Sequence, residues 1–315
     1  MAALKKPPAK VIATLSILLF SASLVVLFFK LRQYSMAEIF ANLSLLSPRK
    51  LLPAIFFTAC NYLVVCGYYI LAFRYIRISL PVNTILYGSF VSNAVSNNAG
   101  YSMLSSAAVM YRLYARYHVS LLSVSKVVFI SSLMLWTGLL TIGGMLLIIE
   151  PDVLAHPLHL SIQATRLLGA GILSFIILYV LAGIFRKTPV QVGKFHFTVP
   201  PPSITLWQIV ISCGDWLFAA SALYVLLPHL NVSFSRFMAA YLLAQFFGII
   251  SQVPGGLGVF ETILILVFPK TYTTPQVLSA LVSFRIIYYL LPLFTALALL
   301  GTHGAWSLLK KHTLP

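Results

Sequence analysis

Residues 127–149 read VVFISSLMLWTGLLTIGGMLLII, a run of 23 residues without a single charged side chain. As an α-helix this run is about 35 Å long, enough to cross the roughly 30 Å hydrocarbon layer of a bilayer. The run at 51–73 is equally long and equally uncharged, and the run at 11–29 has 19 such residues. These runs predict a protein that crosses the membrane as a bundle of helices.

The composition supports this prediction. Of the 315 residues, 60% are hydrophobic and only 8% are charged, against about 25% charged residues in a typical soluble domain. The 21 Lys and Arg outnumber the 5 Asp and Glu. The basic residues stand singly or in pairs between apolar segments, which indicates cytoplasmic loops with a secondary attraction to anionic headgroups. The sequence contains no stripe of basic residues of the kind that would predict a nucleic-acid partner.

The apolar segments predict an all-α integral membrane protein with about six full crossings and two re-entrant hairpins. Segment 11–29 is longer than the core of a signal peptide, so we expect an uncleaved first helix. Two further stretches, 101–117 and 257–269, are too short to cross alone and each follows a break in the preceding span. The eight spans are 11–29, 51–73, 81–98, 120–149, 165–185, 204–228, 234–252 and 276–302.

The spans and breaks recur at an offset of 154 residues. Asn61 then aligns with Asp215, Tyr87 with Tyr241, and the first break with the second. We therefore predict one membrane domain over 1–315 that is built from two repeat halves, about 10–155 and 164–309.

Charged loops set the predicted topology. The loop at 150–159 carries Glu150 and Asp152 and no basic residue, so we place it outside, whereas the basic loop at 186–203 lies inside. Both termini are then cytoplasmic, in a cell or inner membrane. Three crossings in each half invert the second half, so the hairpins at 81–117 and 234–270 enter from opposite sides. Transporters with inverted repeats build midplane sites in this way.

Polar residues inside the spans are the candidate substrate-binding residues, because burying them in lipid is costly. Arg112 and Arg285 could attract a phosphate, and Asp215 and Glu261 could attract a cationic group or stabilise those arginines. The alternative is that these acids and arginines only pair with one another to hold the bundle. The polar and aromatic neighbours that complete this set are Asn97, Asn98, Tyr288 and Tyr289.

The two breaks supply candidate hairpin tips. Glycine lets a backbone approach a ligand closely, and a new helix N-terminus favours an anion; a tight turn alone would also need glycine. The tip residues are Gly100 in the first hairpin and Pro254, Gly255, Gly256 and Gly258 in the second.

Motifs for catalysis, cofactors and metals are missing from the sequence. The seven His are scattered, the cysteines at 60, 66 and 213 lie in apolar spans, and no nucleophile elbow, phosphate loop or dinucleotide fingerprint occurs. We therefore expect neither an enzyme nor a cofactor or metal site.

Five stretches resemble one family in order across residues 85–292. The most specific is VPGGLGVFE at 253–261; the others are SNNAGY at 96–101, VMYRLY at 109–114, GDWL at 214–217 with YVLLP at 224–228, and FRIIYY at 284–289 with Pro292. They resemble the lysylphosphatidylglycerol synthase transmembrane region, also called the flippase region of the multiple peptide resistance factor.

The resemblance implies a membrane domain that moves aminoacylated phosphatidylglycerol, or a related phospholipid, between leaflets and so supports resistance to cationic peptides. In bifunctional relatives a separate soluble domain transfers the aminoacyl group from tRNA; these 315 residues hold no such domain, so we expect no synthase activity. A second hypothesis is a non-transporting partner that presents lipid to a separate lipid synthase. A third, an intramembrane enzyme, lacks a recognisable acid–base or nucleophile pair.

Overall fold

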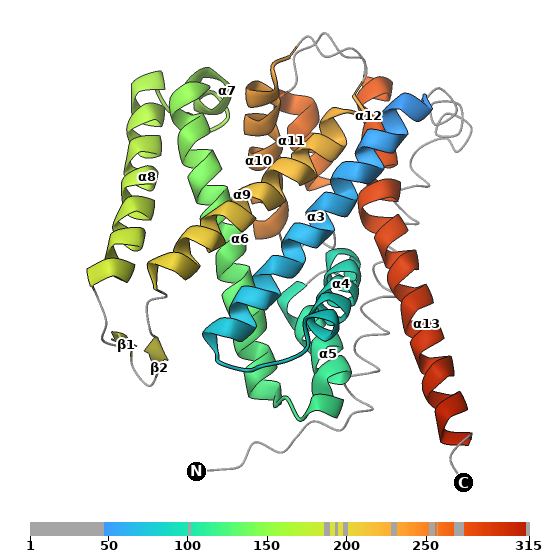
Figure 1. The fold of residues 1–315 in the computed structure, drawn as a ribbon. Helices are drawn as coiled ribbons and strands as arrows, with labels where there is room; N and C mark the ends of the chain where they lie inside the picture. Colours follow the sequence, from blue (N-terminus) through green and yellow to red (C-terminus); the bar gives the residue numbers. More distant parts are fainter. Residues whose placement is uncertain are drawn as a thin grey trace.

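The computed structural model describes residues 47–99, 102–185, 190–192, 195–197, 201–227, 232–251, 256, 258–267 and 274–312, and the predicted first span at 11–29 lies outside them. Within these residues the chain is helical except for one two-stranded ribbon (Figure 1). The helices are α3 (Pro48–Tyr75), α4 (Val82–Ala99), α5 (Ser102–Tyr114), a 3₁₀ turn (Ala115–Tyr117), α6 (Leu121–Ile149), α7 (Pro151–Ala155), α8 (Ile162–Phe185), α9 (Pro202–Tyr224), α10 (Phe234–Ile250), α11 (Val259–Val267), α12 (Thr274–Phe284), a π-helical segment (Arg285–Leu290) and α13 (Leu291–His312).

Five segments of the described chain are long and apolar enough to cross a membrane: Pro48–Tyr75, Leu121–Ile149, Ile162–Phe185, Pro202–Tyr224 and Ser279–Gly301. They confirm the five predicted crossings that fall within the described residues. The all-helical prediction needs one addition, because β1 (Val190–Val192) pairs antiparallel with β2 (Phe195–Phe197) in the predicted loop at 186–203. The last crossing also differs from a regular helix, since the π-helical segment interrupts it.

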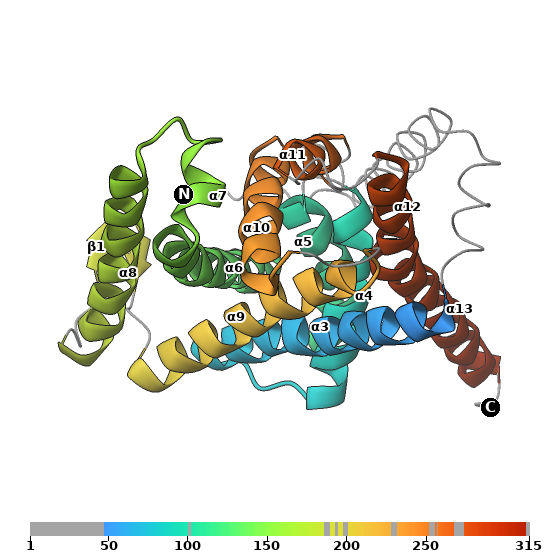
Figure 2. The same ribbon diagram turned by 90° about the horizontal axis from the view of Figure 1, so that it is seen from above.

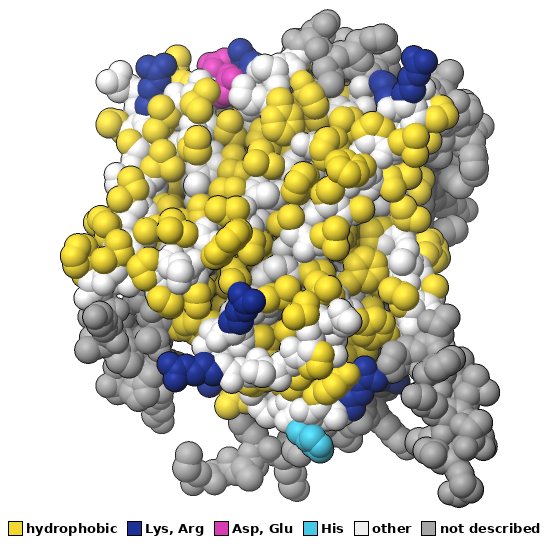
Figure 3. Space-filling model, in the orientation of Figure 1, with side chains coloured by type: hydrophobic (Ala, Val, Ile, Leu, Met, Phe, Trp, Pro, Cys, Tyr) yellow, Lys and Arg dark blue, Asp and Glu magenta, His cyan; other side chains and the backbone are white. Residues whose placement is uncertain are grey.

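The surface matches a membrane environment. A broad hydrophobic band covers the face in Figure 3, and Lys and Arg gather toward its upper and lower ends. Helix α8 contributes strongly to this band, with Leu167, Phe175 and Leu178 each more than 60% exposed. In water this surface would drive aggregation, whereas in lipid it is the expected exterior.

Helices α3 and α9 cross the centre of the bundle side by side and in opposite directions (Figures 1 and 2). The ammonium Nζ of Lys50, at the start of α3, donates to the carbonyl of Leu227, just beyond the end of α9 (2.9 Å). Helix α6 packs so closely on α9 that a Cβ at Gly138 would lie 2.5 Å from the backbone of Ser212. This close approach is typical of small residues at interfaces between membrane helices.

The described parts of 81–117 and 234–270, the segments predicted as re-entrant hairpins, form antiparallel helix pairs. Helices α4 and α5 are joined by the Ser92 and Ser106 hydroxyls (2.7 Å). Helices α10 and α11 pack through the Tyr241 and Phe260 rings (centroids 5.6 Å apart). The α4–α5 pair lies in the lower half of the molecule and the α10–α11 pair in the upper half (Figure 1).

Candidate functional site

A cavity of about 240 Å³ lies between the two hairpins. Its wall comes from α3, α4, α5, α6, α9, α10 and the π-helical segment. Among the described residues, Asp215 is the one charged side chain on this wall. The wall is otherwise rich in aromatic side chains: Tyr68, Tyr69, Trp216, Tyr241, Tyr288 and Tyr289.

Asp215 lies half-way along α9 and is only 6% exposed. Its Oδ1 accepts a hydrogen bond from Asn61 Nδ2 (2.7 Å), and its Oδ2 accepts one from the Tyr68 hydroxyl (2.8 Å). Asn61 in turn accepts one from the Tyr288 hydroxyl (2.8 Å). Within the described chain, no basic side chain lies within 4.0 Å of this carboxylate.

The break in the last crossing shapes another part of the wall. Pro292 has no N–H to complete an α-helical bond to the carbonyl of Tyr288, and the Tyr62 hydroxyl donates to that carbonyl instead (3.2 Å). Asn98 Nδ2 donates to the carbonyl of Tyr289 (3.2 Å). Side chains from α3 and α4 therefore satisfy carbonyls at the π-helical segment, a distortion that often marks functional sites.

Glu261 and Arg285 form a buried pair behind the cavity. One Glu261 oxygen accepts from Arg285 Nη2 (2.7 Å) and Nε (3.1 Å), while the other accepts from the backbone N–H of Gly258 (2.7 Å). The second bond is one half of a capping box, with Gly258 at the N-cap of α11 and Glu261 at its third residue. The Arg285 guanidinium also stacks on the Tyr289 ring (4.7 Å to the centroid). The pair therefore ties α11 to the π-helical segment.

The structure places the predicted site residues in three groups. Asp215, Asn97, Gly256, Tyr288 and Tyr289 lie on the cavity wall, and Asn98 contacts that wall through Tyr289. The Glu261–Arg285 pair does not contribute to the wall, which fits the alternative that these charges pair with each other.

Arg112 is exposed on α5 and also does not contribute to the wall, so the structure does not bring it to the other candidates.

Both described tip glycines have positive φ, 63° at Gly256 and 84° at Gly258, conformations that glycine adopts without strain. The remaining tip residues, Gly100, Pro254 and Gly255, lie outside the described residues.

Sequence reasoning missed several wall residues. Tyr68 lies seven positions after Asn61, two helical turns further along the same face of α3. This spacing could have predicted that Tyr68 and Asn61 face the same site. Ser131 of α6 carries a buried hydroxyl that faces the cavity and has no hydrogen-bond partner among the described residues. Nothing in the apolar run around Ser131 distinguishes it from its neighbour Ser132.

Comparison with known proteins identifies the family. Residues 12–296 match the model of the lysylphosphatidylglycerol synthase TM region. The chain belongs to this family. It is 37% identical over 290 residues to the protein slr0712 of Synechocystis, covering 92% of this chain and 90% of that one. It is 26% identical to the inner membrane protein YbhN of Escherichia coli, covering 78% of each chain.

In a third relative, the matching region is a small part of a much longer protein. Phosphatidylglycerol lysyltransferase of Staphylococcus aureus (strain MRSA252) is 27% identical over 237 residues, which cover 74% of this chain but only 27% of the enzyme. The similarity thus concerns a membrane region that the family shares, and the lysyltransferase name applies to that relative. The protein is therefore a multi-pass membrane protein of this family.

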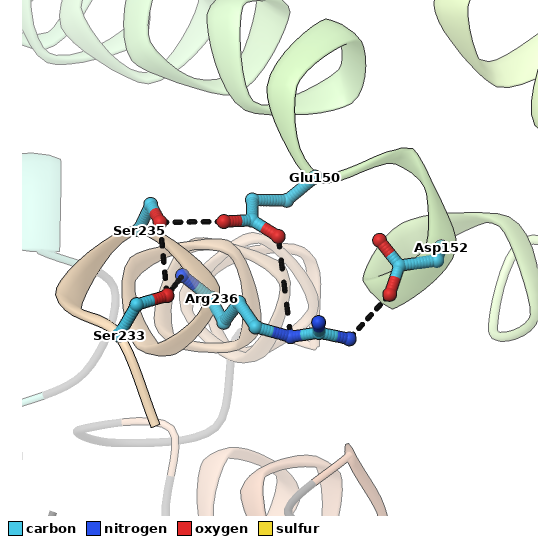
Figure 4. Close-up of polar contacts among 5 residues, drawn as sticks. All are labelled: Glu150, Asp152, Ser233, Ser235 and Arg236. Carbon is cyan, nitrogen blue, oxygen red and sulfur yellow. Dashed lines mark hydrogen bonds and ion pairs between the residues drawn. The ribbon is translucent and has the colours of Figure 1, made fainter. Parts of the chain in front are cut away.

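A second polar cluster connects the start of α10 to the α6–α7 junction (Figure 4). Arg236 pairs with Asp152 and approaches Glu150 (Nε to Oε2 3.9 Å), and Glu150 accepts a hydrogen bond from Ser235 (2.5 Å). Sequence reasoning used Glu150 and Asp152 only as topology markers. The cluster fixes one end of the α10–α11 hairpin against α6 and α7. Within the described residues, no group of three or more potential metal ligands occurs.

Proposed function

We propose that this protein moves an amine-bearing phospholipid, such as aminoacylated phosphatidylglycerol or a related lipid, between the two leaflets of the cell membrane. The observation that carries the proposal is the Asp215 carboxylate, which lies on the cavity wall without a basic partner among the described residues. A buried anion is stabilised most directly by a positive group, and a lipid ammonium supplies one.

The aromatic wall supports the same ligand chemistry. Tyrosine and tryptophan faces attract ammonium groups through cation–π interactions, and Tyr68, Tyr241 and Trp216 line the cavity together with Asp215. Arg112 and Arg285 do not contribute to the wall, so the cavity favours the amine of the headgroup over its phosphate. This refines the expected roles, because Glu261 is neutralised by Arg285 and Asp215 alone is left for the amine.

The cavity volume fits a headgroup rather than a whole lipid. Sites for drug-sized ligands have volumes of roughly 300–1,000 Å³, and this cavity has about 240 Å³. The headgroup would pass through the protein while the acyl chains stay in the bilayer.

The proposal includes the inverted repeat over 10–155 and 164–309. Helices α3 and α9 both begin with proline, at Pro48 and Pro202, at the predicted offset of 154. Asn61 and Asp215, also 154 residues apart, contact each other at the crossing of these helices. Such a contact is expected for equivalent residues near a two-fold axis in the membrane plane. The hairpins in opposite halves of the molecule agree with this symmetry (Figure 1).

In this arrangement both termini face the cytoplasm and the α6–α7 junction faces outward. The acidic residues of that junction and the basic loop at 186–203 support this orientation. Alternating access would then come from movement of the α4–α5 hairpin on one side and the α10–α11 hairpin on the other.

The test is leaflet transfer in liposomes that contain the purified protein. Lysyl-phosphatidylglycerol would be placed in one leaflet, and an impermeant amine-reactive reagent would follow its arrival in the other. Phosphatidylglycerol with a fluorescent label, whose headgroup has no amine, would be the comparison lipid. We expect fast transfer of the aminoacylated lipid and slow transfer of the other. Asp215→Asn should abolish transfer, whereas Lys126→Gln, which removes an exposed charge outside the cavity, should keep it.

Equal transfer of both lipids, or full transfer by Asp215→Asn, would contradict the proposed role of the carboxylate. Absence of transfer by the purified protein, together with co-purification of a lipid synthase, would favour the alternative of a presenting partner.

A further inference from the structure

The contacts around Asp215 determine which atom donates and which accepts in each hydrogen bond. Asn61 Nδ2 lies 2.7 Å from the backbone carbonyl oxygen of Asp215, which can only accept. This contact fixes the orientation of the Asn61 amide, so the same nitrogen also donates to Asp215 Oδ1 and the amide oxygen accepts from Tyr288. The remaining carboxylate oxygen accepts from the Tyr68 hydroxyl.

Every bond in this network therefore points toward the carboxylate. An ionised carboxylate is an acceptor only, so the arrangement fits Asp215 as an anion. Hydrogen bonds compensate part of the cost of burying this charge, but removing a charge from water stays unfavourable without a counter-charge. The described chain offers no basic side chain within 4.0 Å. In each state of a transport cycle the carboxylate needs a positive partner, and the described residues do not supply one.

Among the described residues, the groups that face Asp215 from the elements packed on α9 are hydroxyls, amides and aromatic rings rather than charged side chains. Arg285, the strong base of the π-helical segment, is paired with Glu261. The titratable and polar groups on the shared wall are Tyr68 and Tyr69 on α3, Ser131 on α6, Tyr241 on α10, and Tyr288 and Tyr289 on the π-helical segment. Beyond the wall, Tyr62 on α3 bonds the carbonyl of Tyr288, Tyr179 on α8 bonds Gln208, Cys213 lies on α9 itself, and α12 contributes the apolar Phe284.

We propose that Asp215 exchanges a proton for the lipid amine, so that the protein is a proton–lipid exchanger. This inference rests on the proposed function. When the ammonium leaves, one proton from water binds Asp215 and forms the neutral acid; when the ammonium returns, the O–H bond breaks and that proton goes back to water. One proton thus moves against each ammonium, and the cavity never closes around an uncompensated anion.

Tyr68 and Ser131 give the exchange a local mechanism. A proton on Oδ2 of Asp215 must donate to the Tyr68 oxygen, which requires Tyr68 to turn its own hydrogen away from the carboxylate. Tyr68 lines the cavity, so that hydrogen can point into it. Ser131, on the same wall, carries a buried hydroxyl for which the described part of the chain provides no partner. Its oxygen can accept a hydrogen bond from an entering ammonium.

The first experiment imposes a pH gradient on liposomes that contain the protein and lysyl-phosphatidylglycerol. One-for-one exchange should enrich the lipid in the leaflet that faces the acidic side, on the order of tenfold per pH unit at equilibrium. Reversing the gradient should reverse the enrichment, and Asp215→Asn should show none. Transfer that always stops at equal leaflet occupancy would overturn the exchange and leave the proposed lipid movement intact.

The second experiment does not depend on transport. Infrared titration of the protein in nanodiscs of uncharged lipid, with the Asp215→Asn spectra subtracted, should reveal a protonated carboxyl that appears as the pH falls. Addition of lysyl-phosphatidylglycerol should reduce that signal and release protons into a weakly buffered medium, whereas phosphatidylglycerol should not. A carboxylate that stays ionised throughout, or lipid binding without proton release, would overturn the inference even if no transfer were measured.

Discussion

The Glu261–Arg285 pair should be strongly coupled in stability, and a double-mutant cycle measures this coupling. The two side chains are 14% and 10% exposed and share bonds of 2.7 and 3.1 Å. Breaking a buried pair by removing one partner typically costs about 3–5 kcal/mol, because it leaves the other charge uncompensated. Glu261→Gln and Arg285→Met should each lower the free energy of unfolding by about that amount.

The double variant should cost less than either single variant. Its glutamine can still accept the hydrogen bond from the Gly258 N–H, so the N-cap of α11 is retained, and no buried charge remains. Replacing a buried ion pair with apolar or neutral groups is often close to neutral in stability. The expected coupling energy is therefore about 3 kcal/mol or more.

Equilibrium unfolding in mixed micelles with increasing SDS, followed by circular dichroism, gives these free energies. The matched control is the Arg236–Asp152 pair, in which both side chains are 49% exposed; an exposed pair of this kind couples by less than about 1 kcal/mol. If the cost of the double variant equals the sum of the two single-variant costs within about 0.5 kcal/mol, the reasoning is refuted. The stability contributed by Glu261 would then not depend on Arg285, nor that of Arg285 on Glu261.

Three further predictions concern single positions. Gly138→Ala should destabilise by about 1–3 kcal/mol, because its Cβ would meet the α9 backbone, whereas Gly143→Ala, whose Cβ meets nothing within 4 Å, should be neutral or stabilise by up to about 1 kcal/mol in the same unfolding assay. Tyr62→Phe removes the donor to the carbonyl of Tyr288 and should cost about 1–3 kcal/mol; an unchanged midpoint would show that this carbonyl has another donor. Ser131→Ala should keep or raise stability, since it removes a buried hydroxyl without a partner, while it slows transfer of the aminoacylated lipid; a loss of stability would contradict this assignment.

The crossings could be predicted from the sequence because hydrocarbon allows few alternatives. Every backbone polar group must be satisfied inside the membrane, so each long uncharged run can only be a helix, as α6 at Leu121–Ile149 shows. The break in the last crossing was not predicted, although Pro292, just after the π-helical segment Arg285–Leu290, was a usable signal for it. The π-helical form of that break depends on donors from α3 and α4, which local sequence does not reveal.

The candidate site was less accessible to sequence reasoning. Polar residues in spans pointed to Asp215, which the structure places on the cavity wall, but position along a helix does not say which way a side chain faces. Arg112 lies in the correct hairpin and yet on its exposed side. Tyr68, Tyr69 and Tyr241 of the wall were not singled out among the 16 tyrosines of the chain, because their place on the wall follows from how each helix is rotated against its neighbours. Packing of distant segments determines that rotation.

The contact between Asn61 and Asp215 gives the proposed symmetry a chemical consequence. If the equivalent position in both halves were aspartate, two carboxylates would meet at the crossing of α3 and α9 and repel each other. If both were asparagine, the cavity would hold no charge for an ammonium or a proton. One amide and one carboxylate leave a single negative charge next to the proposed two-fold axis, at mid-helix depth in both α3 and α9. In the proposed symmetry a charge on this axis is related in the same way to both hairpins, so each hairpin could expose it to its own side in turn. A single central carboxylate is therefore what alternating access through two inverted halves requires, and Asn61→Asp should disrupt transfer as strongly as Asp215→Asn.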